Sequence, residues 1–300
     1  MCEVWTAVSL RMQSEIKVDL HCHSYYSDGT TSPESLLARA LTNHVTHLAI
    51  TDHDCTAAFD EIKPDAGDVT LIGGVEISCD WLGQEIHIVG LFIDRHNTQL
   101  KGLLNDQQQS RRLRVEGMSE KLNSLGSPGL MDYLESLPAI ALTRSHVADF
   151  LVDQQICKTR KSAFKTHLGK RGMLYVAPQW VSLEDAVGAI IHAGGFAVLA
   201  HPSRYSLKNK KLNALASSFK AAGGIALEGS YPNIDKKTMS RLEALAIEHS
   251  LMLSIGSDFH DPEAHWTDLG KFPRLDSSAS TRALWHHPLW QLKVESVFTL

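Results

Sequence analysis

The chain alternates short apolar runs with longer stretches of helical periodicity. Seven runs rich in Val, Ile and Leu have the length and pattern of β-strands. Between several of them lie helical patterns with start signals, such as Ser32-Pro33-Glu34 and Ser182. The predicted strands cover residues 16–20, 47–51, 69–77, 85–93, 196–200, 224–229 and 251–256.

This alternation of strand and helix predicts a fold class. Strands separated by helices are typical of parallel sheets whose faces the helices cover. Seven such units fit a small, irregular α/β barrel better than an open sheet. We therefore expect an α/β barrel with its strands parallel.

Residues 98–175 interrupt the alternation, because they contain two long helical patterns and no convincing strand. We interpret them as an inserted helical subdomain, or lid. The barrel itself is then predicted to comprise residues 13–97 and 176–275. Residues 276–300 form a tail with little periodicity and no evident role, and residues 1–11 are expected to add nothing to the fold because Met12 is a plausible alternative start.

Composition is that of an ordinary globular protein. The 300 residues are 43% hydrophobic and 21% charged, enough for one large domain with a smaller insert. No apolar run approaches the roughly 18 residues that cross a bilayer, and the first residues lack a signal-peptide pattern, so we expect a cytoplasmic protein without a membrane partner. The five cysteines form no CxxC pair and are expected to be reduced.

Charge is unevenly distributed along the chain. The formal net charge of −5 argues against a protein that coats nucleic acid through its overall field. Residues 98–175 nevertheless carry 12 Lys and Arg against 7 Asp and Glu, whereas the rest carries 17 against 27. An acidic body suits cation binding and a basic lid suits an anionic substrate, although a solvated helix surface also accounts for part of this charge.

Histidine is the residue type in excess, with 16 copies. Imidazole serves as a metal ligand and as an acid–base group near neutral pH, so its placement matters. In DLHCHS, directly after the first predicted strand, His21 and His23 are two residues apart and point the same way in an extended chain. One HxH pair is weak support for a metal site, because packing also produces such pairs.

The same arrangement recurs, since six of the seven predicted strands carry a ligand-type residue, usually just past the strand end. In a parallel barrel the carboxyl ends of the strands open on one face, so these side chains converge there. By contrast, His44, His47, His192 and His249 lie within or beside helix-like surfaces and are better explained as packing groups. The convergent residues are His21, His23, His53, Glu76, His87, His201, Asp258 and His260.

The mixture of ligand types narrows the choice of ion. Imidazoles and carboxylates without thiolates suit Mn²⁺, Fe²⁺ or Zn²⁺, whereas Mg²⁺ and Ca²⁺ favour more oxygen ligands. We favour Mn²⁺. Two or more such ions a few Å apart activate a bridging water and stabilise the charge of an in-line displacement at phosphorus. The pattern therefore predicts phosphoester hydrolysis.

Six motifs, taken in order, resemble the PHP (polymerase and histidinol phosphatase) superfamily over about residues 17–97 and 176–270: DLHCHS with Asp28, TDHD, GVEIS, the strand of His87, AHP and SDFH. The resemblance implies an irregular (β/α)7 barrel with three metal ions, expected to be Mn²⁺ with Zn²⁺ or Fe²⁺ as alternatives. It further implies one ion held by His21, His23, Glu76 and Asp258, a second by Glu76, His87 and His201, and a third by Asp28, His53 and His260.

GVEIS, TDHDCT, HPSRY and the helical insertion are similar to a bacterial branch of that superfamily containing nucleoside 3′,5′-bisphosphate phosphatases and 5′-3′ exoribonucleases. The likeness implies a metal-bridging hydroxide as nucleophile, with Asp258 and His260 in the catalytic set. Arg204 is expected to orient phosphate. Asp54 is expected to orient the substrate or relay a proton, with a helix N-cap as the alternative. Arg111, Arg114, Arg144 and His146 are expected to bind substrate phosphate, although each arginine could instead be a surface charge.

Three functions remain open from the sequence. The preferred one is hydrolysis of a nucleotide phosphoester, either a 3′,5′-bisphosphate or the 5′ end of a short RNA, with no obligate protein partner. The second is a histidinol-phosphate or other small-molecule phosphatase. The third is a non-catalytic metal-binding PHP module, which the complete ligand set disfavours.

Overall fold

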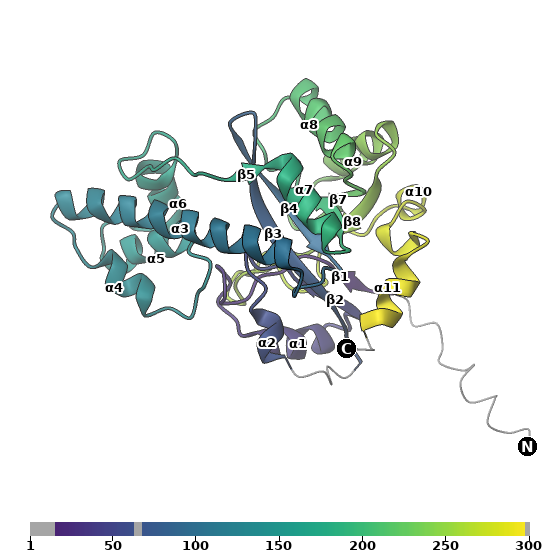
Figure 1. Cartoon of the computed structure of the whole chain (residues 1–300), viewed down its shortest axis with the longest axis horizontal. Coiled ribbons are helices and arrows are strands. Elements are labelled where there is room, and N and C mark those ends of the chain that lie inside the picture. The colour runs from purple at the N-terminus through teal and green to yellow at the C-terminus, as the bar shows by residue number, and fades with distance from the viewer. Residues whose placement is uncertain (1–15, 63–67, 298–300) are drawn as a thin grey trace, which may run out of the picture.

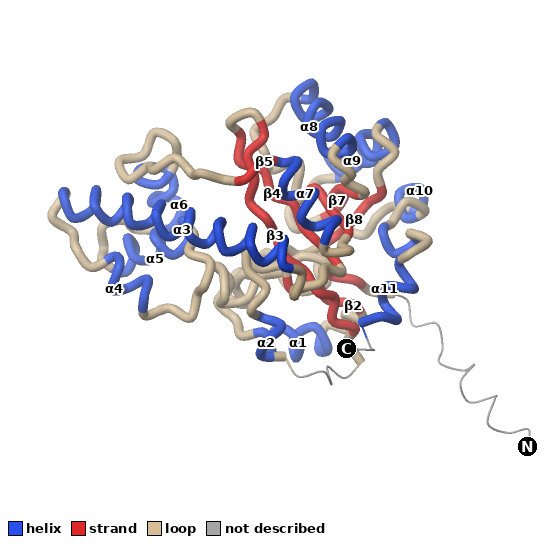
Figure 2. The backbone as a smooth tube through the Cα atoms, viewed as in Figure 1, coloured by secondary structure: helices blue, strands red, loops and turns tan. Residues whose placement is uncertain are grey.

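Figure 1 shows the computed structural model of the chain, which describes residues 16–62 and 68–297. The predicted barrel start at residue 13, residues 1–11 and the last three residues of the predicted tail lie outside these ranges. The fold is mixed α/β, built on one nearly closed, barrel-shaped sheet (Figure 2). Around it run β1 (Val18–Asp19), β2 (His47–Ile50), β3 (Thr70–Trp81), β4 (Gln84–Leu91), β6 (Phe196–Leu199), β7 (Ala226–Ser230) and β8 (Met252–Ile255), while β5 (Val181–Ser182) pairs with β3 off this path.

The seven predicted strands are thus confirmed, but the expectation that all are parallel is wrong. Strand β4 is antiparallel to both of its neighbours, β3 and β6. The reason is local: Leu82 and Gly83 have φ values of 52° and 75° and join β3 to β4 directly. A two-residue turn of this kind can only connect antiparallel strands, so no helix separates this pair.

The barrel closes between its last and first strands through single hydrogen bonds. The Leu20 amide donates to the Ile255 carbonyl at 3.1 Å, and the Asp258 amide donates to the His21 carbonyl at 2.7 Å. Gly256 permits this approach, because a Cβ atom there would lie only 2.4 Å from the His21 Cβ. Closure therefore brings the motifs after β1 and β8 together.

Helices flank the sheet, as the alternation predicted. Helix α1 (Pro33–Thr42) begins where Ser32 accepts a hydrogen bond from the Ser35 amide, and α7 (Leu183–His192) where Ser182 accepts one from the Asp185 amide. Both serines act as the helix N-caps that the sequence indicated. The other flanking helices are α2 (Ala58–Glu61), α8 (Asn209–Ala221) and α9 (Lys236–Glu248).

After β4 the chain leaves the barrel as a group of helices, visible at the left of Figure 1. Their apolar faces share a cluster of their own, which includes Met118, Leu130, Leu151 and Leu168. This separate cluster supports the proposal that residues 98–175 form an inserted subdomain. The helices are α3 (Thr98–Ser124), α4 (Leu130–Glu135), α5 (Arg144–Asp153) and α6 (Arg160–Ala163), which runs into the π-helical turn η1 (Phe164–Leu168).

The C-terminal tail forms α10 (Ser277–Ser280), η2 (Leu284–His286) and α11 (Trp290–Val297), and it packs on the barrel. The Trp290 side chain is buried, with its ring centre 4.9 Å from that of Phe92 and 6.1 Å from that of His47. His47 begins β2 and Phe92 follows the antiparallel β4, so both mark the same end of the barrel. Helix α11 therefore covers the end opposite the histidine-bearing loops.

Among the described residues, no helix is both long enough and apolar enough to cross a membrane. Cys22, Cys55, Cys79 and Cys157 are buried free thiols, in line with the reduced state expected from the sequence. Cys2 lies outside the described residues.

Candidate metal centre

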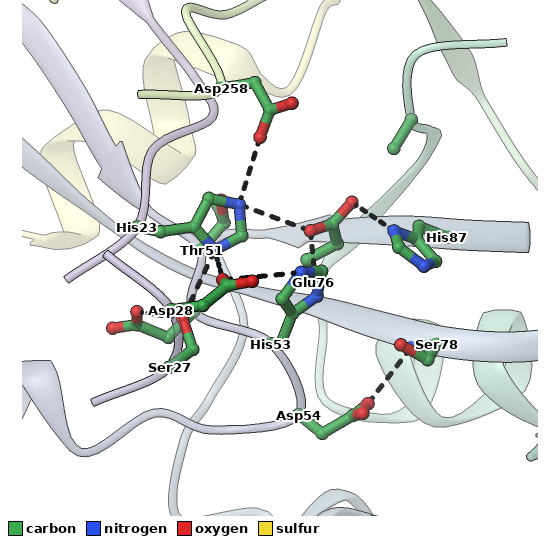
Figure 3. Close-up of polar contacts among 12 residues, drawn as sticks. His23, Ser27, Asp28, Thr51, His53, Asp54, Glu76, Ser78, His87 and Asp258 are labelled. Atoms are coloured by element: carbon green, nitrogen blue, oxygen red, sulfur yellow. Dashed lines mark hydrogen bonds and ion pairs between the residues drawn. The ribbon is translucent and has the colours of Figure 1, made fainter. Parts of the chain in front are cut away.

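Glu76 on β3 is the centre of the site. Its side chain is 1% exposed, and its two oxygens face different histidines (Figure 3). Oε1 lies 3.0 Å from His87 Nδ1 and 3.0 Å from His201 Nε2. Oε2 lies 3.3 Å from His21 Nε2, 3.3 Å from His23 Nε2 and 3.1 Å from His53 Nδ1.

Two further carboxylates lie on either side of this arrangement. Asp258 Oδ1 is 3.2 Å from His23 Nε2 and 3.4 Å from His21 Nε2. Asp28 Oδ1 is 3.2 Å from His260 Nε2 and 3.7 Å from His53 Nε2. Three carboxylates and six histidines from six different strand ends and loops thus share one buried space.

The structure brings together all nine residues that the sequence analysis named as metal ligands. Within the described chain they form overlapping groups whose ligand atoms lie within 4.8 Å of one another. One group lacks only Glu76 from the set expected for the first ion, and another contains the whole set expected for the third ion together with His23. The residues expected for the second ion are divided between two groups that share Glu76. The groups are His21, His23 and Asp258; His21, Glu76 and His201; His53, Glu76 and His87; and His23, Asp28, His53 and His260.

Several atoms of this cluster lack the partners that buried polar atoms need. Asp28 Oδ1, His53 Nδ1, Glu76 Oε2 and His201 Nδ1 are buried and lack a well-aligned hydrogen bond within the described residues. The first three have only ion-pair contacts, among them those given above. Burying such atoms unpaired is unfavourable by about 1–3 kcal/mol each. A divalent cation supplies the missing interaction for oxygen and imidazole donors of this kind, so these residues fit bound metal.

The charges of the cluster favour cations. Burial alone would raise the pKa of Glu76, but His21, His53 and His87 hold it well below its usual value. Burial alone would lower the pKa of the histidines, and it does so for His53 and His201. The ionised carboxylate and the neutral imidazoles are the forms in which these side chains bind metal.

Two of the nine clustered residues also have an unusual backbone. His201 has φ of 29° and Asp258 has φ of 47°, although neither is glycine. Such conformations are unfavourable by about 1–3 kcal/mol each and concentrate at functional sites. They turn the chain sharply just past β6 and β8 and direct both side chains into the cluster.

A basic pocket opens beside the cluster. Asp28, His53 and His87 form its wall on the metal side, and residues of the helical insertion form the other wall. Arg111, Arg114 and Arg144 line that second wall. The predicted phosphate-binding arginines of the insertion therefore do face the predicted metal ligands.

The comparisons with known proteins agree with this geometry. The sequence profile of the PHP domain family matches residues 19–169. The chain is also 40% identical over 278 residues to the 5′-3′ exoribonuclease Rnm of Escherichia coli (strain K12), with 91% of this chain and 93% of that protein covered. The chain belongs to the PHP domain family.

Two further relatives come from Chromobacterium violaceum. The 3′,5′-nucleoside bisphosphate phosphatase of that organism is 37% identical over 261 residues, covering 84% of this PHP chain and 90% of the phosphatase. A solved structure described as an amidohydrolase with bound sulfate and no metal has a TM-score of 0.82 at 34% identity, covering 94% of this chain and 96% of that one. The barrel and its insertion are thus shared over nearly the whole length.

Glu228 on β7 is a residue that the sequence analysis of this PHP domain missed. Its Oε1 lies 2.7 Å from His21 Nδ1, and its Oε2 accepts a hydrogen bond from the His201 amide at 2.5 Å. A carboxylate behind a ligand histidine fixes the ring so that the other nitrogen faces the metal. Strand β7 was the one predicted strand from which the sequence analysis named no ligand, and Glu228 places a carboxylate behind two of the clustered histidines.

Glu85 and Trp180 of the basic pocket were also missed. Glu85 lies two residues before His87 on the same face of β4, and its Oε1 is 3.1 Å from Arg144 Nη2. The Arg111 and Arg114 guanidinium carbons lie 4.9 Å and 5.4 Å from the centre of the Trp180 indole. The Glu-x-His spacing within a strand was the signal available for Glu85.

Three other predicted residues have their polar atoms engaged within the protein. Asp54 is fully buried, accepts from the Ser78 amide at 3.0 Å and pairs with Arg111 at 2.7 Å. His146 Nδ1 accepts from the Thr143 amide, which leaves its Nε2 to donate to the Ser27 carbonyl at 2.8 Å. These contacts fasten the insertion to the barrel, and a substrate role for Asp54, Arg111 and His146 stays a prediction.

Arg204 lies on the other side of the cluster from the basic pocket. Its guanidinium forms an ion pair with Asp258 and covers the ring of Tyr231 at 5.1 Å. The side chain is 42% exposed, so it is accessible from solvent. Its position next to a predicted metal ligand is compatible with the expected phosphate contact.

Proposed function

We propose that this PHP domain is a divalent-metal-dependent hydrolase of nucleotide phosphoesters, acting as a nucleoside 3′,5′-bisphosphate phosphatase and as a 5′-3′ exoribonuclease on RNA 5′ ends. The names of the relatives support this choice. The main support for this proposal is that a basic pocket lies directly beside the histidine–carboxylate cluster. The cluster and the pocket together offer two anion sites. One is for the phosphate that reacts and the other for a phosphate that does not.

The nine clustered residues are proposed to hold three ions, preferably Mn²⁺, with Zn²⁺ or Fe²⁺ as alternatives. Such ions, when bound, lower the pKa of coordinated water and neutralise charge on the reacting phosphate. Glu76 is proposed to contact two of the ions, since its oxygens face separate histidine groups. Asp258 and His260 complete the set from the loop after β8, and Arg204 is proposed to hold a phosphate oxygen.

The second phosphate is proposed to bind at Arg114 and Arg144. Arg114 Nη2 is buried and makes no hydrogen bond with any described residue. Burial and the nearby Arg144 and Arg111 lower the pKa of Arg114 to about 10, against the opposing effect of Glu85, so the group stays charged at neutral pH. Crowded guanidinium groups with a free donor are well suited to a phosphate dianion.

One site can serve both substrates. The 5′ nucleotide of a phosphorylated RNA has a 5′ phosphate and a phosphate on its 3′ oxygen, as a 3′,5′-bisphosphate does. With the 5′ phosphate in the basic pocket, the 3′ phosphate lies toward the cluster in both cases. Recognition of an end by phosphate contacts requires no base-specific contact.

The experiment measures hydrolysis of adenosine 3′,5′-bisphosphate and of a 5′-monophosphorylated oligoribonucleotide with Mn²⁺. We expect turnover of both, lost in Asp258→Ala and in His260→Ala and retained in His192→Ala, which removes an exposed histidine at the end of α7. Absence of turnover with metal bound, or much faster turnover of histidinol phosphate, would overturn the proposal. Retained turnover in both cluster variants would argue for chemistry elsewhere.

The first prediction concerns the second phosphate. Arg114→Met should lower kcat/KM on adenosine 3′,5′-bisphosphate by about 30-fold relative to adenosine 3′-monophosphate, since a buried charged contact contributes about 2 kcal/mol or more. Arg112→Met, on the exposed face of the same helix, is the matched control. Thermal unfolding of each variant checks folding. Arg144→Met, which removes a half-buried guanidinium group, is a second test of the same phosphate contact. An equal loss on both substrates would count against a phosphate contact.

A further inference from the structure

A second groove reaches the cluster from another direction. Asp258 and His260 lie at its inner end, and Arg204, Tyr231 and Trp266 line its length. No residue lines both this groove and the basic pocket, which reaches the cluster through Asp28, His53 and His87. Among the described residues the metal centre therefore has two separate approaches.

Trp266 is the most unusual side chain of this groove. It is 69% exposed, and its indole offers a large, rigid apolar face with a polar N–H to a ligand. The turn that carries it is ordered by three hydrogen bonds: the Ala264 amide to Asp261, the Thr267 amide to Ala264, and the Thr267 hydroxyl to the Ser257 carbonyl at 3.2 Å. The indole ring of Trp266 is therefore exposed to solvent beside the cluster, six residues after His260.

The charges along the groove are nearly balanced. Arg204 and Arg160 supply two cations, and Arg160 is already paired with Asp149 at 2.8 Å. Three carboxylates oppose them: Asp258, which is paired with Arg204, Asp261, and Asp235, which caps α9 through the Thr238 amide at 2.8 Å. The groove is therefore not built to attract phosphates by charge alone, and a flat ligand would gain most by stacking.

We propose that this groove receives the second nucleotide of an RNA 5′ end, with its base stacked on Trp266. The inference rests on the proposed function. If the first nucleotide has its 5′ phosphate in the basic pocket and its 3′ phosphate at the cluster, the rest of the chain must leave by another route. The groove is that route, and Trp266 is a sequence-tolerant platform for the base that follows.

The proposed hydrolysis step is compatible with this direction of the RNA. Water adds its oxygen to the phosphorus, the bond from phosphorus to the first nucleotide's O3′ breaks, and O3′ takes a proton. The first nucleotide leaves with its 5′ phosphate and a free 3′ hydroxyl. The new oxygen stays on the 5′ phosphate of the second nucleotide, which can then move up to the basic pocket.

The test compares kcat/KM on a 5′-phosphorylated trinucleotide with kcat/KM on adenosine 3′,5′-bisphosphate, which has no second nucleotide. Trp266→Ala should reduce the trinucleotide value at least about 5-fold more than the bisphosphate value, the low end of base–aromatic stacking. Trp266→Phe should restore most of that difference. The difference should change little with salt, because stacking and not charge produces it.

Leu292→Ala is the matched control, since Leu292 is 61% exposed on α11 at the other end of the barrel. It should leave the ratio of the two values unchanged. An equal effect of Trp266→Ala on both substrates, or no effect on either, would overturn the inference while leaving the proposed function intact. Failure of the unaltered protein to hydrolyse either substrate would instead overturn the proposed function, and the inference with it.

Discussion

At the scale of single residues, protons and metal ions compete for the same imidazole nitrogens of the cluster. Close contacts with the Asp258 and Glu76 carboxylates outweigh burial and raise the pKa of His23 to about 9. Glu76 and Glu85 likewise outweigh burial and raise the pKa of His87 to about 10. Without a cation, these two histidines therefore carry protons near neutral pH, and an ion must displace them.

The second prediction follows from this competition. Binding of Mn²⁺ should release protons, and the affinity should rise from pH 6.5 to pH 8.5, because protons compete less strongly with the ion for His23 and His87 as their concentration falls. Calorimetric titration in two buffers of different ionisation enthalpy measures both quantities. Affinity that stays constant over this range, with no proton release, would show that both imidazoles are already neutral.

The third prediction concerns Glu228. Glu228→Gln removes the charge that holds the His21 ring while keeping its size, and should weaken Mn²⁺ binding by about 10- to 100-fold. Glu248→Gln, an exposed residue at the end of α9, is the control. Calorimetry gives the affinities, and excess Mn²⁺ should restore turnover. Unchanged affinity would mean that the neighbouring ligands orient His21 without Glu228.

These residues also show what a sequence can reveal at this scale. Seven of the nine clustered residues were predictable because they lie in short polar motifs beside an apolar strand. Glu76 and His87 lie inside strands, and the family motifs helped to identify them. Glu228 was not predictable, because the segment GIALEGS places it inside a strand where a buried carboxylate has no local signature. Its role depends on His21, which is 207 residues away in sequence.

At the scale of elements, the junction between barrel and insertion depends on a buried ion pair. Asp54 and Arg111 connect the loop after β2 to α3, and both are nearly inaccessible to solvent. Gln107, one turn earlier on α3, donates to the Ser78 carbonyl on β3 at 2.5 Å. The sequence predicted Arg111 as a phosphate ligand but did not reveal its pairing with Asp54, because charge alone does not tell a buried pair from a free cation.

The fourth prediction tests this junction. Arg111→Met should destabilise the protein by about 3 kcal/mol or more, because it leaves the Asp54 carboxylate buried without its partner. Adding Asp54→Asn should recover part of that loss, since the uncompensated charge is then removed. Urea unfolding measures both variants against Arg112→Met. Equal stability of the single and double variants would show that the pair is not coupled.

At the scale of elements, the positions of the strands could be predicted from the sequence, but the direction of one strand could not. The strands and the helix starts at Ser32 and Ser182 follow from local patterns, so they were predictable. The antiparallel course of β4 was not, because it depends on Leu82 and Gly83 both adopting positive φ, and leucine gives no hint of that. The reversal explains why His87 lies near the start of its strand and still faces the cluster.

At the scale of the whole molecule, the two ends of the barrel differ: the histidine–carboxylate cluster lies at one end, and the C-terminal tail packs on the other. The clustered residues and both approaches lie at the end where the loops after β1, β2, β6 and β8 meet. The C-terminal tail closes the opposite end through Trp290 and Leu284. The packing of this tail could not be predicted from the sequence, because an eight-residue helix is too short to show a clear periodicity.

The fifth prediction separates these two ends. Trp290→Ala should lower the free energy of unfolding by about 3–5 kcal/mol, because it empties a well-packed aromatic site. Mn²⁺ affinity and kcat/KM at 25 °C should stay unchanged, since the cavity lies at the far end of the barrel. Bound Mn²⁺ stabilises the folded state by mass action, so saturating Mn²⁺ should add the same stabilisation to the variant as to the unaltered protein. A smaller gain in the variant would show that packing around α11 is coupled to the metal centre through the strands.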